Sequence, residues 1–184
     1  MKKLVLVLLI LLVAASSAFA FDILSYPPPL EGGGDFMIDV GVGLAAYGWG
    51  GKISIPPLFL DIEYALPVMV PISVGGFVSF FQYKYAYQSL WNEKWTFVVS
   101  GARANWHWGF DVEWLDFYTG IWMGYRYFRF SSDKSVSSGY NKPTYGGFDW
   151  GTQVGAHFYF TNIVGVIVES GYPYWIKAGL ALKF

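Results

Sequence analysis

Apolar and polar side chains alternate with a period of two along most of the chain after residue 35. At the C-terminus, one parity holds only apolar residues and the other holds glycine, alanine and lysine. The apolar set is Ile176, Ala178, Leu180, Leu182 and Phe184. Successive side chains of a strand point to opposite faces, whereas a helix repeats its apolar positions every three to four residues. The last nine residues therefore predict a strand with one apolar face.

The same alternation returns in seven earlier segments. We expect eight strands, over residues 36–46, 58–66, 72–82, 95–108, 116–129, 148–160, 163–169 and 176–184. Residues 95–108 alternate less regularly, so we expect a bulge or register change near Val99. Proline interrupts a strand ladder because it lacks an N–H group. The prolines that fall in the predicted connections are Pro56, Pro57, Pro67, Pro71, Pro143 and Pro173.

The predicted connections alternate in length. The longer set covers residues 47–57, 83–94, 130–147 and 170–174, and the shorter set covers 67–71, 109–115 and 161–162. Transmembrane barrels have short periplasmic turns and longer outer loops. An N-terminus in the periplasm therefore puts the longer set outside the cell.

The first 20 residues have the pattern of a secretory signal peptide. Lys2 and Lys3 precede an apolar run over residues 4–15, and small residues ending in Ala18 and Ala20 follow. The run is shorter than the roughly 20 residues of a membrane-spanning helix. We expect cleavage after Ala20, which leaves residues 21–184 as one domain with 10 basic and 13 acidic residues and a net charge of −3.

The composition favours a membrane environment. The chain is 54% hydrophobic, 21% aromatic and only 14% charged, against roughly 25% charged in soluble domains. No apolar stretch after residue 20 is long enough for a helical span, and a closed barrel is the other structure that pairs every backbone group inside lipid. The predicted fold is all-β, an eight-stranded antiparallel up-and-down transmembrane β-barrel of the bacterial outer membrane. The absence of cysteine excludes disulfides, and the few basic residues argue against nucleic acid.

The polar face decides which side of the barrel meets lipid. A soluble lipocalin-like barrel has the same alternation with its faces reversed, but its water-facing side carries about 25 to 35% charged residues. Here the polar face is mainly Gly, Ala and Ser, which suits the narrow interior of eight strands. Interfacial aromatics are expected at strand ends, with ordinary core packing as the alternative. They are Trp106, Trp108, Trp114, Tyr125, Tyr127, Trp150, Tyr172, Tyr174 and Trp175.

The C-terminal strand carries a family resemblance. Its residues Ile176, Leu180 and Leu182, with the aromatic Phe184 last, resemble the terminal strand of Gram-negative-type outer-membrane proteins. The resemblance implies that the outer-membrane assembly machinery reads this strand. In length and strand rhythm residues 21–184 resemble the small eight-stranded OmpA/OmpX-type and OmpW-like barrels.

Charged residues on the predicted interior face should form one network, because an unpaired charge in a low-dielectric lumen is costly. They are Asp39, Asp61, Glu63, Arg103, His107, Asp116, Arg126, Asp149, His157, Glu169, Lys177 and Lys183. We expect this network to fill and fix the barrel. If Arg103 and Arg126 pair with inward carboxylates, losing either should cost roughly 3 to 5 kcal/mol.

An enzyme is one alternative, since some eight-stranded outer-membrane barrels are lipid A deacylases or acyltransferases that use Ser, His and an acidic residue. Neither His107 nor His157 has the serine that the deacylases place two residues after histidine. We therefore predict no catalytic residue, while a triad of distant residues stays open because triads are defined by geometry. Two histidines without cysteine predict no metal site, and no cofactor is expected.

A narrow conduit for small hydrophobic solutes is the second alternative, implied by the OmpW-like resemblance. Phe77, Phe81, Phe97 and Trp122 point inward in the outer half, where they either line an apolar pocket or form a plug. The longest predicted loop is polar and contains Ser131, Ser132, Asp133, Lys134, Ser135, Ser137, Ser138, Gly139 and Tyr140. The first hypothesis is a structural or surface-interaction barrel, with outer-membrane lipid, the assembly machinery and an extracellular ligand of the loops as partners.

Overall fold

The computed structural model describes residues 21–22, 25–45, 51–87, 91–132 and 144–184, so the predicted signal segment lies outside the described residues. None of the helices in these ranges is long and apolar enough to cross a membrane. The strands are β1 (Phe21–Asp22), β2 (Phe36–Ala45), β3 (Lys52–Ala65), β4 (Ile72–Tyr87), β5 (Trp91–Phe110), β6 (Leu115–Ser132), β7 (Thr144–Tyr159), β8 (Val164–Gly171) and β9 (Tyr174–Lys183).

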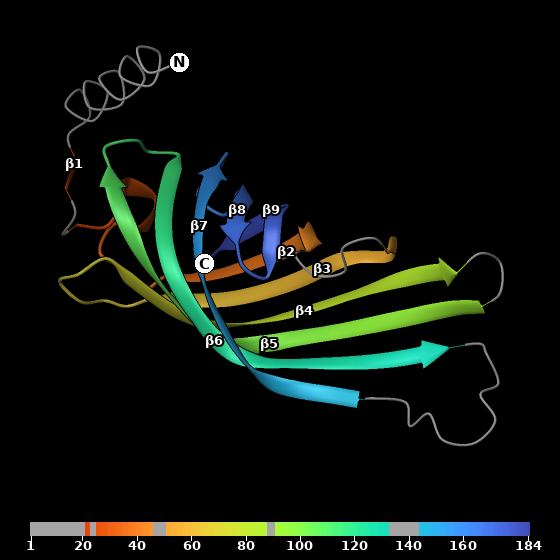
Figure 1. Ribbon diagram of the computed structural model, residues 1–184. Helices are drawn as coiled ribbons and strands as arrows, with labels where there is room; N and C mark the ends of the chain where they lie inside the picture. The colour runs from red at the N-terminus through yellow and green to blue at the C-terminus, as the bar shows by residue number, and fades with distance from the viewer. Residues whose placement is uncertain (1–20, 23–24, 46–50, 88–90, 133–143) are drawn as a thin grey trace, which may run out of the picture.

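Strands β2 to β9 form a closed antiparallel barrel (Figure 1). Each strand pairs with its neighbours in sequence, and β2 pairs with β9 to complete the circle. The two-residue β1 adds only a short pairing to the end of β5, at Gly109 and Phe110. The predicted eight-stranded up-and-down barrel is confirmed.

The two faces of the wall have opposite chemistry. Outward side chains such as Val40, Ile121 and Leu180 are 47%, 55% and 43% exposed, whereas the inward Asp39 and Arg103 are 1% and 4% exposed. Water around the barrel would reverse this pattern, because exposed apolar bands are unfavourable there. The apolar face is the lipid-facing one, as predicted.

Strands β4 to β7 are longer than the sequence predicts. Residues 83–94, predicted as a loop, belong mostly to β4 and β5, and Ser131 and Ser132 continue β6. Residues 144–147 belong to β7, while residues 133–143 of the predicted loop lie outside the described residues. Figure 1 shows these strands extending to the right, well past β2, β8 and β9. Beyond the lipid both faces of a strand can be polar, so the alternation that marks a strand disappears there.

The irregularities lie elsewhere than predicted. Val99 sits in continuous register between Ser79 and Arg126, so the bulge expected there is wrong. Its position is apolar because the upper interior is apolar. Register shifts occur instead in β3, between Ile53 and Ile55 and between Ile55 and Leu58. Pro56 and Pro57 thus lie within β3 and not in a connection, at a bulge where a missing N–H is tolerated.

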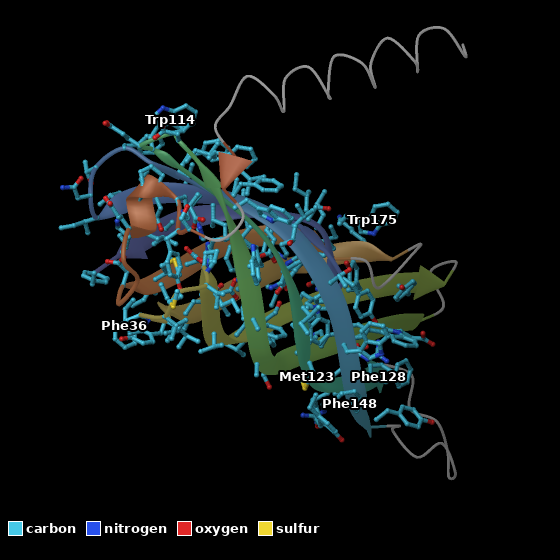
Figure 2. All side chains as sticks on the ribbon, turned by 90° about the vertical axis from the view of Figure 1, so that its left-hand side faces the viewer. Phe36, Trp114, Met123, Phe128, Phe148 and Trp175 are labelled. Carbon is cyan, nitrogen blue, oxygen red and sulfur yellow. The ribbon has the colours of Figure 1, made fainter. Side chains whose placement is uncertain are left out.

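Most of the predicted interfacial aromatics face lipid. Trp114, Trp150 and Trp175 are 53%, 66% and 57% exposed, and Figure 2 shows Trp114 and Trp175 on the outside toward opposite ends of the barrel. The prediction is wrong for Tyr172 and Tyr174. Tyr174 is 5% exposed inside the barrel, and Tyr172 stacks on the inward Trp122. Both side chains point into the barrel at the tight connection between β8 and β9.

A segment before β2 packs under the short-turn end, and the alternation pattern does not predict it. It contains a 3-10 helix, η1 (Pro28–Leu30), whose Leu30 is fully buried with Met37 and Ala65. The single proton of the Tyr26 hydroxyl is shared between the carbonyl oxygens of Leu66 at 2.8 Å and Ile72 at 2.6 Å. Burial raises the pKa of Tyr26, so the hydroxyl stays a donor. These contacts fasten the segment across the barrel end.

Candidate functional site

The lower interior is organised around Arg103. Its guanidinium group forms ion pairs with Asp61 at 2.6 Å, Glu63 at 2.9 Å and Glu169 at 2.5 Å. These partners come from β3 and β8, and at most 5% of any of the four side chains is exposed. A planar guanidinium presents five N–H donors in fixed directions, which suits three carboxylates arranged around it.

Lys177 of β9 adds a second cation to the same carboxylates. Its ammonium group contacts Asp61 and lies 2.9 Å from Glu169. The Tyr118 hydroxyl donates a hydrogen bond of 2.7 Å to Glu169. Tyr118 reaches this position because Gly155 faces it, where a Cβ would lie 2.5 Å from the hydroxyl oxygen. The charges are therefore paired and hydrogen-bonded, as buried charges must be.

A chain of hydrogen bonds runs from Asp39 through two histidines to Ser73. His157 contacts Asp39 at 3.2 Å and Asp116 at 2.8 Å through its two ring nitrogens. Asp116 contacts His107 at 2.7 Å, and the other nitrogen of His107 lies 2.9 Å from the Ser73 hydroxyl. All five side chains are at least 99% buried.

The acceptors around the histidines define their protonation. Both nitrogens of His157 face carboxylate oxygens, which only accept, so both must carry protons. Glu63 forms an ion pair with Arg103 at 2.9 Å and accepts a hydrogen bond from the Asn105 amide at 2.6 Å, so Glu63 is ionised. The Ser73 hydroxyl donates its proton to Glu63 at 2.6 Å. The Ser73 oxygen then accepts from His107, whose second nitrogen donates to Asp116. These contacts are all satisfied when both rings carry two protons and share the Asp116 carboxylate.

Ser73, His107 and Asp116 have the connectivity of a catalytic triad, for which there is no local sign in the sequence. In a working triad the histidine takes the proton of the serine, and a substrate carbonyl must reach the serine oxygen. Here the Ser73 proton points to Glu63, and all three side chains are 0% exposed. The ring of Tyr26 lies 6.0 Å from that of His107. The serine is enclosed, and the arrangement serves as a bridge between strands.

Arg126 and Asp149 lie apart from this network. Their closest atoms are 3.4 Å apart, and 36% of the Arg126 side chain is exposed. Tyr172 connects them, accepting a hydrogen bond from Arg126 at 3.1 Å and donating one to Asp149 at 3.2 Å. Lys183 lies at the opposite end, where its ammonium group donates to the carbonyl oxygen of Pro29. The predicted single network is therefore one large cluster with two outlying contacts.

The upper interior is aromatic. Phe81 and Phe97 stack at 4.9 Å, and Phe77 meets Trp122 edge-to-face at 5.2 Å. Phe81, Phe97 and Trp122 are 0%, 8% and 3% exposed. Rings at these separations leave their contact area dry. The four residues predicted to line a pocket or form a plug therefore pack together in one cluster inside the upper barrel.

This packing continues outward as a ladder of parallel rings across four strands. Phe128 of β6 stacks on Phe97 at 5.3 Å and on Trp95 at 5.0 Å, and Tyr145 of β7 stacks on Phe128 at 5.7 Å. Beside these rings lies a cavity of about 290 Å³. It is lined by Trp95, Phe97, Arg126, Phe128, Tyr145, Gly146 and Gly147. We call the half-exposed part of this surface, Trp95, Phe128 and Tyr145, the aromatic shelf.

The sequence pattern does not predict the shelf: Trp95 and Phe128 lie at the ends of the predicted strands 95–108 and 116–129, but Tyr145 falls in the predicted loop 130–147, so nothing brings the three together. The available signal was an aromatic residue at every second position, Trp95 and Phe97 on one strand and Phe128 and Phe130 on the next. Within the described ranges, no group of three or more histidine and acidic side chains has the arrangement of a metal site.

The terminal strand lies at the seam of the barrel. Its apolar face points to lipid, with Ile176 45%, Leu180 43% and Phe184 64% exposed, and Leu182 half-buried. The backbone N–H and carbonyl of Phe184 pair with those of Phe36 at 2.8 and 2.9 Å. The last strand therefore completes the hydrogen-bonded circle.

Comparison with known proteins places the fold. The chain matches no family model and no curated protein. Its structure is similar to that of Ail, the attachment invasion locus protein of Yersinia pestis, solved with the heparin analogue sucrose octasulfate, with a TM-score of 0.54, 15% identity and coverage of 82% of this chain and 99% of that one. The outer membrane protein OprG of Pseudomonas aeruginosa gives 0.53 and 14%, with coverage of 89% and 99%.

By fold and by its apolar outer band, the chain is a small eight-stranded β-barrel of the outer-membrane type. At these identities the likeness concerns the fold, and activity has to be argued from the residues.

Proposed function

We propose that this protein is an integral outer-membrane barrel with a closed, structural interior, and that the sheet formed by β4 to β7 contacts a ligand outside the cell. One observation carries the proposal. These four strands extend past the apolar band and present the aromatic shelf on their inner face. Binding residues tend to lie where a rigid scaffold projects beyond the core of a domain.

The export and assembly signals belong to the same proposal. Residues 1–20 direct secretion and are removed after Ala20, and the strand ending at Phe184 is read by the assembly machinery. The position of β9 at the seam supports this role, because closing the barrel requires its pairing with both β2 and β8.

The interior supports a closed barrel rather than a conduit for hydrophobic solutes. Below lies the charged cluster around Arg103, and above it lie the stacked Phe81 and Phe97. We expect no steady single-channel conductance from the purified barrel in planar bilayers. A double variant, Phe81→Ala with Phe97→Ala, is the control that thins the plug. Reproducible openings of the unaltered protein would favour the conduit instead.

An enzymatic role has less support. Ser73 is the one serine that contacts a buried histidine in the described residues, and its side chain has no exposed surface. A nucleophile must reach its substrate. We therefore propose that the contacts among Ser73, His107 and Asp116 stabilise the folded barrel.

The upper part of β3 pairs with β4 and extends the protruding sheet on one side, and the two edges of the sheet differ. The β3 edge carries Pro56, Pro57 and two register shifts, devices that block pairing with another strand. The β7 edge pairs with β6 from Thr144 onward, but β8 pairs with β7 only from Gln153. Within the described residues, the upper part of β7 thus has no strand partner on its second side, directly beside the shelf.

An extracellular ligand also agrees with the comparison, since the similar structure of Ail holds a heparin analogue. The present chain has its own chemistry where β4 to β7 protrude, with the shelf beside Arg126. Aromatic rings supply large rigid contact area at low entropic cost, which is why they are frequent in binding surfaces.

Adhesion tests the proposal. Cells displaying the protein are compared with empty cells on surfaces coated with heparin or matrix proteins. The double variant Trp95→Ala, Tyr145→Ala is expected to lose most of the retention given by the unaltered protein. Tyr127→Ala, an exposed aromatic on the lipid-facing side of β6, is the matched control and should retain it. If the displayed protein gives no retention above empty cells, the interaction role fails and the structural role remains.

A further inference from the structure

Three lysines face each other on the outside of the protruding sheet. Lys52 of β3 is directly opposite Lys84 of β4, and Lys84 is directly opposite Lys94 of β5. All three are exposed. Arg129 of β6, also exposed, pairs with Thr96 and so lies diagonally next to Lys94. We call these four residues the cationic ladder.

The ladder is an unusual arrangement for a sheet. Directly opposite side chains have Cβ atoms about 4.5 to 5.5 Å apart, and like charges there are destabilising. In the part of the chain that the structure describes, the carboxylates in ion pairs are bound by Arg103, Arg126, Lys177 and the two histidines. None of them is bound by a member of the ladder. Among the described residues, these four positive charges thus lie together without an ion-paired carboxylate.

The ladder lies just beyond the lipid-facing band. On β4 the outward positions change from Val78 and Phe80 to Gln82 and Lys84, and Gln82 donates a hydrogen bond of 2.9 Å to Thr96 on β5. At about 3.3 Å per residue, Lys84 lies roughly 13 Å along the strand from Phe80, and less in height because barrel strands tilt. Headgroups add roughly 5 to 8 Å on each side of the hydrocarbon core. The ladder is therefore at the level of the headgroups or just above them.

We propose that the cationic ladder binds the phosphate groups of an anionic glycolipid in the surrounding outer leaflet. The lysines project from the lipid-facing side of the sheet, opposite to the aromatic shelf, so the membrane and not a soluble ligand lies next to them. Lysine ammonium groups on long stems reach headgroup oxygens readily and act as point charges toward phosphate. A phosphate beside the ladder supplies the missing counter-charge. This inference is independent of the shelf and its ligand.

Binding of lipid A, a phosphorylated glycolipid, tests the inference. Fluorescent lipid A is titrated onto the full barrel in nanodiscs of neutral phosphatidylcholine. A variant with Lys52→Gln, Lys84→Gln and Lys94→Gln is expected to bind roughly 100-fold more weakly, from about fivefold for each charge near an anionic headgroup. The triple Lys→Arg variant keeps the charge and should stay close to the unaltered protein. Added salt should reduce the difference, because exposed charges are screened.

Folding and ligand source are checked separately. In neutral nanodiscs the Gln variant should keep its heat-dependent gel shift and melt no lower than the unaltered protein, because repulsion between the lysines is removed. Equal lipid A binding by the Gln variant and the unaltered protein would overturn the proposal. Competition by inorganic pyrophosphate at matched phosphate concentration would also overturn it, by showing a site for free anions. Binding that depends on the ladder and resists pyrophosphate supports the lipid.

Discussion

Replacing Arg103 with alanine is expected to lower the free energy of unfolding by about 3 to 5 kcal/mol. Its guanidinium group is the shared partner of Asp61, Glu63 and Glu169, and only 2% of the side chain is exposed. Lys177 still contacts Asp61 and Glu169 in the variant, but Glu63 loses its cation. Glu63 keeps the hydrogen bonds from Ser73 and Asn105, but a buried charge without a counter-charge remains strongly destabilising. Urea titration of the barrel in lipid vesicles, followed by tryptophan fluorescence and gel shift, measures the loss.

Arg126→Ala is the matched control for this prediction. The sequence predicted the same large cost for both arginines, and the structure changes that expectation for Arg126. Its pair with Asp149 is 3.4 Å long, and its side chain is 36% exposed. Partly exposed pairs contribute at most about 1 kcal/mol. A loss at Arg103 no larger than that at Arg126 would mean that the interior cluster is not the dominant polar contribution.

Arg103→Lys separates charge from geometry. An ammonium group keeps the positive charge but cannot point N–H groups at three carboxylates in fixed directions. We expect a loss between those of the other two variants. This ordering is a sharper test than any single value, because the three variants share one method and one reference state.

Parity, together with the low charge of the polar face, was sufficient to predict the two faces of the wall. Inside the lipid every outward position must be apolar, so Val40 and Ala104 face lipid while Asp39 and Arg103 face the interior. The same physics explains where the prediction stopped. Beyond the band, Lys84 and Lys94 face outward while Tyr83 and Trp95 face inward. Polar and aromatic residues are exchanged between the faces there, so the pattern predicts a loop over residues 83–94, most of which belong to β4 and β5.

Which charged side chains pair inside the barrel could not be predicted from the sequence, for a different reason. Which charges meet depends on strand tilt and register, which no local pattern contains. His157 and Asp39 are 118 positions apart, and Asp116 serves histidines from both of its neighbouring strands. The segment around Tyr26 has no alternation at all, so its place under the barrel had no sequence signal. Ser73 and His107 are neighbours because of the register between β4 and β5, which the residue types do not reveal.

Asp116→Asn is expected to cost about 3 to 5 kcal/mol, close to the loss at Arg103. The carboxylate of Asp116 accepts from His107 at 2.7 Å with one oxygen and from His157 at 2.8 Å with the other. An amide of the same size offers one acceptor and one NH₂ group, so one histidine then faces a donor. Either that imidazolium loses its proton or a buried charge is left unpaired, and both outcomes weaken the contact.

Ring nitrogen NMR shows which outcome occurs. In the unaltered protein both nitrogens of His107 and His157 should have the shifts of protonated imidazolium, because each ring has two acceptors. In the Asn variant one ring should become neutral while the barrel keeps its gel shift. Ser73→Ala is the comparison, since it removes one neutral acceptor from His107 and leaves Asp116 intact. We expect it to cost about 1 to 3 kcal/mol. Neutral histidines in the unaltered protein would contradict the protonation inferred from the contacts, and with it the larger cost assigned to Asp116.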